Sequence, residues 1–295
     1  MDKTFILGVG AQKCGTSWLS SYINQSQQAN LGILKEYHCW DAKTLELCEE
    51  FKTVDDNLLI QSDQYQIRHK MQNIEGYYER YFAKILEGRI NITGDITPSY
   101  SMLSSKTFSE IKRRFEDLNI NVKVIFLMRD PVDRVISHIK MLAKFKKISD
   151  RTGFDKNQSS AANIATKHER AVYNNKLSFE ENLVALYQSP LVKQRTLYQE
   201  TVSELLNVFD SKDCFFQIYE KMFEVDEITR MSEFLGIDVN LKYRETQINA
   251  AEKQNYHVNQ QTKKMIANTF SETYVFAEQF GFNVKYNWNN YILTR

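Results

Sequence analysis

Glycine and proline are scarce in this chain, whose 295 residues include only 10 Gly and 3 Pro. All-β sandwiches and fibrous proteins need many more of these residues, so the composition disfavours both classes and favours long helices with few breaks. Lysine and arginine number 38 against 37 aspartates and glutamates. The net charge of +1 therefore gives no global reason to expect nucleic acid or an acidic membrane as a partner.

Cysteine is also rare, and its four positions show no metal-binding spacing. Cys14, Cys39, Cys48 and Cys214 form no CxxC pair, so we expect reduced thiols, no metal site and a cytoplasmic protein. Long hydrophobic runs are lacking, since none approaches the roughly 18 apolar residues that span a bilayer. The short apolar run at residues 5–9 predicts a buried strand and not a signal peptide.

Strand and helix patterns alternate along the chain. Strands are expected at residues 5–9, 29–34, 90–93, 122–128 and 214–219, with a turn at Gly94. Helices are expected from residue 16 and at residues 107–118, 132–145, 179–209 and 262–280. This alternation predicts an α/β fold with a central parallel sheet flanked by helices. No break in composition marks a boundary, so we expect a single domain over residues 1–295, with a polar surface excursion at about 146–167.

A loop framed by two glycines follows the first expected strand and opens the first helix. Gly10 and Gly15 have four residues between them, which is the outline of a phosphate-binding loop. Backbone N–H groups at a helix start point at an anion, and glycine lets the backbone approach it. Thr16 and Ser17 add hydroxyl donors at the first helical turn. The strand before the loop and the helix after it favour phosphate binding over an ordinary turn that contains glycines.

The position of the lysine separates this loop from those of nucleotide triphosphatases. A Walker loop has lysine directly after the second glycine, whereas Thr16 stands there in this chain and the lysine is Lys13, inside the loop. The nearest candidate aspartate for Mg²⁺, Asp130, lies in an Arg-Asp-Pro turn. A nucleotide-dependent kinase is therefore disfavoured, but it stays an alternative, as does an inactive module that binds a nucleotide or polyanion.

A second basic motif follows the clearest expected strand, at residues 122–128. Arg129 stands where that strand ends, and open α/β sheets bind ligands at the carboxyl ends of their strands. Pro131 can begin the next helix, and Ser137 lies further along it. A guanidinium and a hydroxyl suit a second phosphate. The alternative is a surface pair of Arg129 and Asp130 that caps the helix.

Together the two motifs resemble those of the sulfotransferase family, whose members transfer a sulfuryl group from 3′-phosphoadenosine-5′-phosphosulfate (PAPS). The resemblance implies a P-loop NTPase-like, three-layer fold and no catalytic metal. It also implies that the first motif binds the 5′-phosphosulfate and the second motif the 3′-phosphate. The nucleotide contacts implied by this resemblance are Gln12, Lys13, Cys14, Gly15, Thr16, Ser17 and Trp18 in the first motif, with Arg129 and Ser137 in the second.

Two further segments resemble the glycosaminoglycan-type branch of that family. Residues 35–41 contain its Glu-x-His pattern, which implies Glu36 as the general base, with His38 as a competing base. Residues 94–100 resemble an acidic-Lys-Thr-Pro segment and make Asp95 a third candidate, although the usual lysine is Ile96 here. Lys13 is implied to stabilise the charge on the leaving phosphate.

The implied reaction yields 3′-phosphoadenosine-5′-phosphate (PAP) and a sulfated product. The expected partner is a small-molecule or carbohydrate acceptor that offers a hydroxyl, with no nucleic acid and no membrane span. Residues 253–257 are a candidate for a loop that closes over PAPS, although they lack glycine. Arg195 and Tyr198 are candidates for nucleotide contact, with an ordinary surface-helix role as the alternative.

Overall fold

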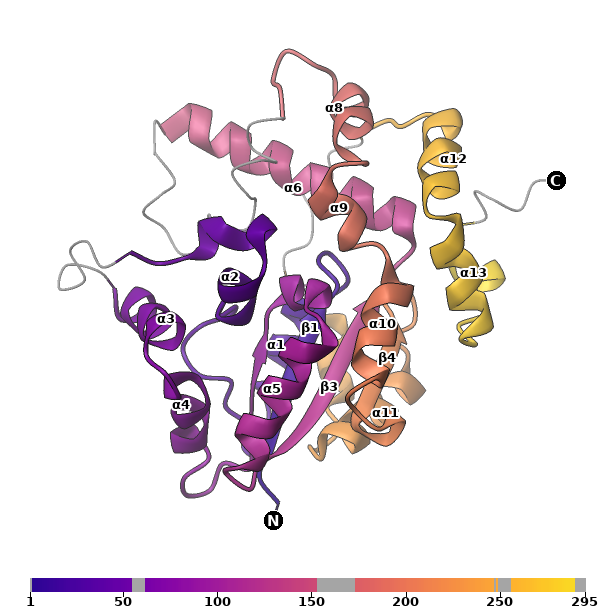
Figure 1. Cartoon of the computed structure of the whole chain (residues 1–295). Helices are drawn as coiled ribbons and strands as arrows, with labels where there is room; N and C mark the ends of the chain where they lie inside the picture. The colour runs from indigo at the N-terminus through magenta and orange to yellow at the C-terminus, as the bar shows by residue number, and fades with distance from the viewer. Residues whose placement is uncertain (1, 55–61, 153–172, 247, 249–255, 290–295) are drawn as a thin grey trace. The chain divides into compact units, whose positions relative to one another are not determined.

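The computed structural model describes residues 2–54, 62–152, 173–246, 248 and 256–289. The chain divides into two compact units (Figure 1). Unit 1 comprises Met1–Met128 and Glu200–Asn249, and unit 2 comprises Arg129–Gln199 and Ala250–Arg295. The polar excursion predicted at 146–167 falls mainly outside the described residues, as does most of the candidate loop at 253–257.

Unit 1 is built on a parallel sheet of four strands in the order β2-β1-β3-β4. The strands are β1 (Thr4–Gly10), β2 (Ile92–Ile96), β3 (Asn121–Met128) and β4 (Cys214–Ile218). Every residue of β1 is buried, which explains why this strand is a continuous apolar run and not an alternating one. The parallel sheet predicted from the sequence is confirmed.

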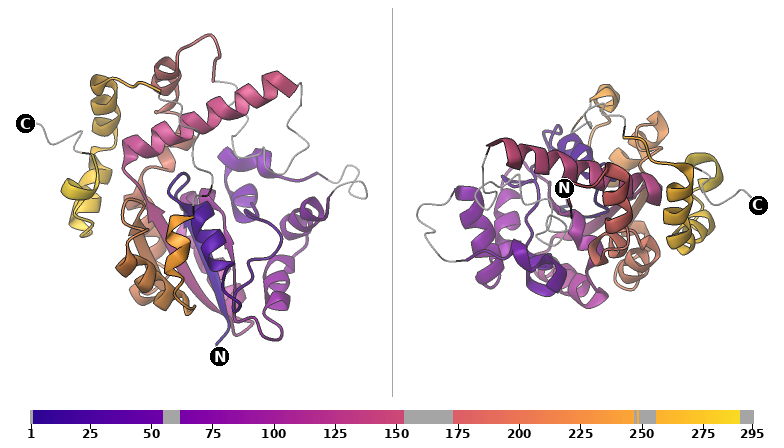
Figure 2. Two further views of the ribbon diagram at one scale, coloured as in Figure 1. Left: turned by 180° about the vertical axis from the view of Figure 1, so that it is seen from behind. Right: turned by 90° about the horizontal axis from the view of Figure 1, so that it is seen from above.

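Helices cover both faces of this sheet. One face carries α1 (Thr16–Ile23) and α11 (Val225–Leu235), where the hydroxyls of Tyr22 and Ser232 lie 2.6 Å apart (Figure 2, left). The other face carries α4 (Tyr77–Ile85), α5 (Ser105–Glu116) and α10 (Tyr198–Leu206). On that face the ring of Phe5 stacks on Phe115 at 3.8 Å, which ties β1 to α5. The predicted three-layer arrangement is therefore confirmed.

The strand order places the predicted phosphate loop at a favourable point of the sheet. From β1 the chain crosses to β2 on one side, and from β2 it crosses over β1 to β3 on the other side. Ligands of open α/β sheets bind at the carboxyl ends of the strands where this direction reverses. The loop that begins at Gly10 leaves the carboxyl end of β1 at that point, and β3 ends one residue before Arg129.

Two expectations for the first 100 residues are wrong. Residues 29–34 form no strand, because only Ala29 bridges to Ile92 and Gly32 turns the chain with a φ of +80°. Gly94 does not make a turn, because β2 continues through it to Ile96. A side chain at Gly94 would meet the backbone of Ile6, so glycine serves there to let two strands pack closely.

The helices expected at residues 179–209 are present, whereas the single helix expected at 262–280 is divided in two. Between residues 179 and 209 the chain forms α8 (Phe179–Leu186), α9 (Pro190–Gln194) and then α10, since Pro190 lacks an N–H and starts a new helix. Residues 262–280 form α12 (Gln260–Thr269) and α13 (Ser271–Gln279), separated by the buried Phe270. By contrast, α6 (Pro131–Thr152) runs past the predicted end at 145, because no glycine or proline interrupts it before Gly153.

The short elements complete the description. They are α2 (Trp40–Thr44), η1 (Glu46–Phe51), α3 (Asp63–Asn73), η3 (Pro98–Met102), η5 (Ser211–Asp213), η6 (Leu241–Glu245) and α14 (Val284–Asn287). In unit 2, buried apolar residues of α6, α8 and α12 form one cluster that includes Val135, Leu183 and Ile266. Arg134 of α6 is fully buried there and donates to the carbonyl of Val192 at 2.9 Å, so it holds α9.

Candidate functional site

The loop between β1 and α1 has a backbone that glycine makes possible. Gly10 has a φ of +130°, and a Cβ on it would lie 2.6 Å from the carbonyl oxygen of Pro98. Gly15 is the N-cap of α1 with a φ of 93°, and a Cβ there would lie 2.5 Å from the sulfur of Met222. Because Gly15 has no side chain to cap the helix, the N–H groups of the first turn are available to an anion.

The side chains of this loop differ in exposure. Lys13 and Ser17 are partly exposed, whereas Cys14 and Trp18 are buried at 0% and 3% exposure. Trp18 stacks on Tyr22 at 4.9 Å and so belongs to the core beneath the loop. Lys13 and Ser17 are therefore the loop residues placed to present a charge and a hydroxyl to a ligand. Cys14 and Trp18 are buried and support the loop from the core.

Backbone strain marks two of the predicted site residues. Lys13 has a φ of 71° and His38 a φ of 50°, and within the described residues the other non-glycine positive values belong to Asn119 and Asn283. Asparagine and histidine are enriched among the few non-glycine residues that adopt this region, whereas lysine seldom adopts it. Such strain persists where surrounding structure enforces it and is concentrated at functional sites. This observation points to the same two positions that the sequence motifs single out.

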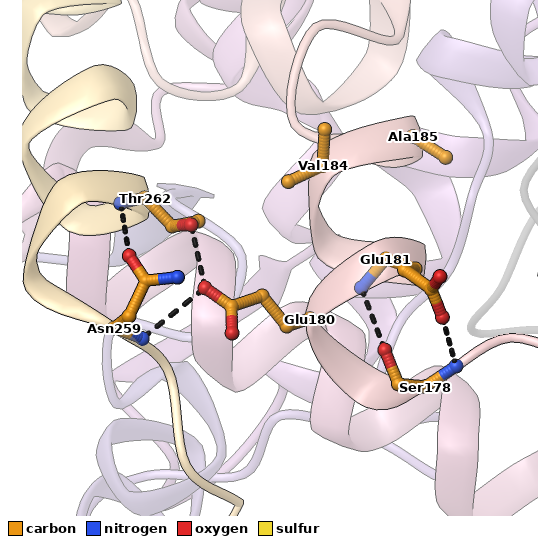
Figure 3. Close-up of a pocket in the computed structure, with 7 residues that line it drawn as sticks. All are labelled: Ser178, Glu180, Glu181, Val184, Ala185, Asn259 and Thr262. Atoms are coloured by element: carbon orange, nitrogen blue, oxygen red, sulfur yellow. Dashed lines mark hydrogen bonds between the residues drawn. The ribbon is translucent and has the colours of Figure 1, made fainter.

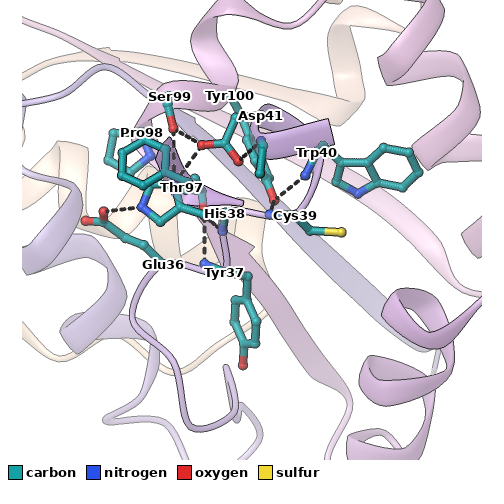
Figure 4. A network of polar contacts seen from close by, with 12 residues as sticks. Glu36, Tyr37, His38, Cys39, Trp40, Asp41, Thr97, Pro98, Ser99 and Tyr100 are labelled. Atoms are coloured by element: carbon teal, nitrogen blue, oxygen red, sulfur yellow. Dashed lines mark hydrogen bonds and ion pairs between the residues drawn. The ribbon is translucent and has the colours of Figure 1, made fainter. Parts of the chain in front are cut away.

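Glu36, His38 and Asp41 form a row of charged groups before and at the start of α2 (Figure 4). His38 Nδ1 lies 2.6 Å from Asp41 Oδ2, and His38 Nε2 lies 3.3 Å from Glu36 Oε2. The hydroxyl of Ser99 also donates to Asp41. Asp41 is fully buried, whereas the side chain of Glu36 is 14% exposed, so Glu36 is the outer member of the row.

The charges in this row stabilise one another. Burial alone would lower the pKa of His38, but Asp41 and Glu36 outweigh it and raise this pKa to about 9. Burial alone would raise the pKa of Glu36, but His38 and Lys35 lower it to about 2. At neutral pH Glu36 is therefore ionised and His38 is protonated. The imidazole ring also stacks on Phe51 at 3.9 Å, an arrangement that favours its charged form.

Asp95 has a different environment from the other two candidate bases. It is fully buried in β2, and its oxygens accept hydrogen bonds from the hydroxyls of Thr97 (2.6 Å), Tyr78 (2.9 Å) and Tyr100 (2.8 Å). Burial raises its pKa to about 6 against the effect of these donors. Thr97 in turn accepts a hydrogen bond from the backbone N–H of Tyr37 at 3.0 Å. This geometry favours a supporting role for Asp95, which fixes the segment that carries Glu36.

The charged row and the phosphate loop lie at the same edge of the sheet. Residues 97–99 follow β2 and connect the two features, since Gly10 approaches the carbonyl of Pro98 and the next residue, Ser99, contacts Asp41. Within unit 1 the loop and the predicted base are thus parts of one region.

The second motif begins unit 2. Asp130 caps α6, because its Oδ1 accepts hydrogen bonds from the N–H groups of Val132 (2.8 Å) and Asp133 (3.3 Å). Asp130 is only 1% exposed, and burial, with Asp133 nearby, raises its pKa to about 7. The predicted phosphate ligands Arg129 and Ser137 are partly exposed. The capping role therefore belongs to the buried Asp130 and not to Arg129.

Two functional candidates were missed in the sequence. Asp41 follows His38 by three residues and lies in the first turn of α2. This short spacing is a local signal that could have indicated the contact. Arg68 of α3 is buried and donates to the carbonyls of Tyr37 (3.1 Å) and Glu36 (2.9 Å), so it holds the backbone of the charged row. No local sequence signal predicts this contact, because Arg68 lies 31 residues after Tyr37.

A shallow pocket lies in unit 2 and is lined by none of the predicted site residues (Figure 3). It is lined by Ser178, Glu180, Glu181, Val184, Ala185, Asn259 and Thr262. Glu180 accepts hydrogen bonds from the Asn259 N–H (3.1 Å) and the Thr262 hydroxyl (2.5 Å), which joins α8 to α12. Acidic side chains that already bridge two helices do not suit a phosphate, so this pocket is not a candidate for the nucleotide.

A family model described as a sulfotransferase domain matches residues 2–281. The chain belongs to this family. The enzyme class expected from the two motifs, a sulfotransferase, is therefore confirmed, whereas the match does not distinguish the glycosaminoglycan branch. No curated protein matches the chain significantly.

One solved sulfotransferase shares the fold, and two others are less similar in structure. A sulfotransferase from Alicyclobacillus acidocaldarius is 16% identical with a TM-score of 0.57, over 95% of this chain and 96% of that chain. Sulfotransferase STF9 from Mycobacterium avium is 13% identical with a TM-score of 0.46, over 95% and 77% of the two chains. The sulfotransferase domain of the Synechococcus PCC 7002 olefin synthase is 13% identical with a TM-score of 0.42, over 92% and 94%. At these identities the likeness concerns the fold alone.

The sequence predicts reduced cysteines and no membrane-spanning segment. All four cysteines are free thiols, and three of them are buried. Among the residues that the structure describes, no helix combines the length and the apolar character needed to cross a membrane.

Proposed function

We propose that this sulfotransferase moves the sulfuryl group of PAPS to an acceptor hydroxyl, leaving PAP and a sulfated product. The observation that carries the proposal is the loop at residues 10–17, which joins a buried strand to an uncapped helix start at the reversal point of the sheet. When bound, PAPS supplies an activated sulfuryl group. The chain's own residues then have to bind the nucleotide, orient it and receive a proton from the acceptor.

The loop residues fit the 5′-phosphosulfate. Gly10 and Gly15 allow the positive φ angles and the close packing against Pro98 and Met222 that form the loop, and the N–H groups at the start of α1 suit a phosphate. Lys13 and Ser17 add a positive charge and a hydroxyl from the partly exposed side of the loop. In this proposal Lys13 binds the oxygen that joins phosphate to sulfur and stabilises the negative charge that develops there. Arg129 and Ser137 are assigned to the 3′-phosphate.

Glu36 is the best supported general base of the three candidates. It is ionised at neutral pH and is the outer member of the charged row, so its carboxylate can take a proton, although its lowered pKa makes it a weaker base than an ordinary glutamate. His38 is protonated at neutral pH, so it cannot accept one, and its ring N–H instead orients Glu36. Asp41 holds the other ring nitrogen and thereby fixes the direction of that N–H. A carbohydrate hydroxyl is one candidate acceptor, suggested by the Glu-x-His pattern.

Nucleotide binding gives the most direct test of the proposed function. PAP should raise the unfolding temperature of the protein, and it should do so more strongly than ATP without Mg²⁺, because at equal concentration the ligand that binds more tightly stabilises the folded state more. Thermal unfolding would be followed by fluorescence over a series of nucleotide concentrations. Equal responses to PAP and ATP, or none to PAP, would remove the cofactor assignment. Stronger stabilisation by ATP in the presence of Mg²⁺ would instead support the alternative of a nucleotide-dependent kinase.

Arg129 is expected to select the 3′-phosphate. The Arg129→Ala variant should bind PAP at least about tenfold more weakly, while its affinity for 5′-AMP, which lacks the 3′-phosphate, should change little. Calorimetric titration of both nucleotides gives the ratio of the two dissociation constants. Arg113→Ala is a matched control, because Arg113 is an exposed arginine on α5. If Arg129→Ala keeps the wild-type ratio, Arg129 does not bind the 3′-phosphate.

A further inference from the structure

The C-terminal segment after α14 packs on the second motif within unit 2. Trp288 follows α14 and is only 4% exposed, although it lies beyond the residues that the family model matches. Its ring meets Tyr274 of α13 edge-on at 5.4 Å and Tyr198 of α10 at 6.4 Å. A buried tryptophan therefore supports two tyrosines that come from different helices.

The hydroxyls of both tyrosines contact the turn that carries Arg129. The hydroxyl of Tyr198 donates to the carbonyl oxygen of Arg129 at 2.9 Å. The hydroxyl of Tyr274 donates to Oδ1 of Asp130, also at 2.9 Å. Tyr198 is fully buried, so this residue, considered above for direct nucleotide contact, is committed to the backbone of Arg129. The turn is thus held at two successive residues by two hydroxyls.

Further contacts make the arrangement rigid. The hydroxyl of Thr273 on α13 donates to the carbonyl of Thr196 at 3.1 Å and to the side chain of Gln199 at 3.0 Å, which ties α13 to the start of α10. Asn289, next to Trp288, donates to the carboxylate of Asp133 at 3.0 Å. The segment around Trp288 therefore touches the motif directly through Asn289 and indirectly through the two tyrosines.

We propose that Trp288 is a positioning residue for recognition of the 3′-phosphate, acting through Tyr198 and Tyr274 to fix the backbone at Arg129. This inference rests on the proposed function. An arginine gives a strong two-point contact with a phosphate only when its fork is held in the correct direction. Fixing the main chain at the arginine restricts that direction before the nucleotide binds, which preserves affinity that would otherwise be lost in ordering the side chain.

The test compares dissociation constants for PAP and 5′-AMP, measured by calorimetry on the full chain. Trp288→Ala should weaken PAP binding about tenfold and change AMP binding little, whereas Trp288→Phe should keep most of the preference for PAP. Tyr198→Phe removes only the hydroxyl that contacts Arg129 and should lower the preference about threefold to tenfold. Tyr286→Ala is the matched control, because Tyr286 is an aromatic residue of α14 that is 85% exposed.

The outcomes separate positioning from general stability. If Trp288→Ala and Tyr198→Phe keep the wild-type preference, or weaken both nucleotides equally, Trp288 has a structural role only and the inference is wrong. If Trp288→Ala does not fold, the single-atom change in Tyr198→Phe still decides. A wild-type protein that does not prefer PAP to AMP refutes the 3′-phosphate assignment itself. A wild-type preference that Arg129→Ala abolishes but the Trp288 and Tyr198 variants retain refutes only the positioning role.

Discussion

Lys13→Ala should abolish most sulfuryl transfer while leaving the protein folded. The loop puts one partly exposed cation where charge is proposed to develop on the leaving phosphate, and removal of one such stabilising group typically lowers turnover by about 10²- to 10³-fold. The expected loss is mainly in kcat, since the interaction is stronger in the transition state than in the bound substrate. Transfer from radiolabelled PAPS to an acceptor panel gives the measurement.

Alanine is a clean substitution at this position. Lys13 already has a φ of 71°, which is unfavourable for any residue with a Cβ, so alanine adds no further backbone strain. The unfolding temperature of Lys13→Ala should therefore stay near that of the wild type. Lys3→Ala is the control, because Lys3 is an exposed lysine beside β1. Lys13→Arg should retain part of the activity. Near-normal turnover in Lys13→Ala would remove the lysine from the mechanism.

The phosphate loop was predictable from the sequence because all of its signals are local. A buried strand appears as an apolar run, the two glycines are four residues apart, and a helical pattern starts at Thr16. Each of these features needs only neighbouring residues to form. The same holds for β3 and for the start of α6 at Pro131, where the strand end and the proline are adjacent in sequence.

The surroundings of the charged row could not be predicted in the same way. Asp95 appears in the sequence as part of a turn after Gly94, but packing against β1 keeps that segment extended. Its three hydroxyl partners come from positions 78, 97 and 100, and only the buried fold brings them together. Arg68 and Phe51 reach the row from distant segments. Long-range packing of this kind leaves no periodic signal.

The end of the chain shows the same limit. A continuous helical pattern at 262–280 predicts one helix, yet the chain bends at Phe270, whose dihedral angles are not helical (φ −107°, ψ 24°). Phe270 is buried in the unit 2 cluster, so burial of its ring outweighs continuation of the helix. The bend begins α13, which carries Tyr274 to Asp130. A break that the sequence pattern does not show thus begins the helix that contacts the second motif.

Glu36→Gln should reduce transfer by about 10²- to 10⁴-fold, the usual contribution of a general base. Glutamine keeps the size of the side chain and can still accept a hydrogen bond from His38, but it cannot take a proton. The wild-type kcat/KM should stay flat between about pH 5 and about pH 8, because Glu36 is ionised and His38 protonated throughout that range. A pH series on wild type, Glu36→Gln and His38→Gln measures this directly.

The pH series also decides between the two bases. If His38 accepts the proton instead, the wild-type kcat/KM should rise with pH towards the pKa of His38, about 9, and His38→Gln should remove the rise. Glu36→Gln with near-normal rates would contradict the proposed base, whatever the profile. Asp95→Asn should differ from both, because loss of the charge that accepts three hydroxyls should lower the unfolding temperature.

Stability should follow the same protonation states. The pKa of His38 is raised in the folded protein, so its stabilising contribution is complete below about pH 6.5 and is lost as the pH rises through about 9. The pKa of Glu36 is lowered, so its contribution is complete above about pH 4.5 and is lost as the pH falls through about 2. The difference in unfolding temperature between wild type and His38→Gln should therefore be largest between about pH 4.5 and about pH 6.5. It should shrink as the pH rises towards about 9. A difference that grows above pH 7 would show that His38 is neutral in the folded protein, and it would return the histidine to the role of base.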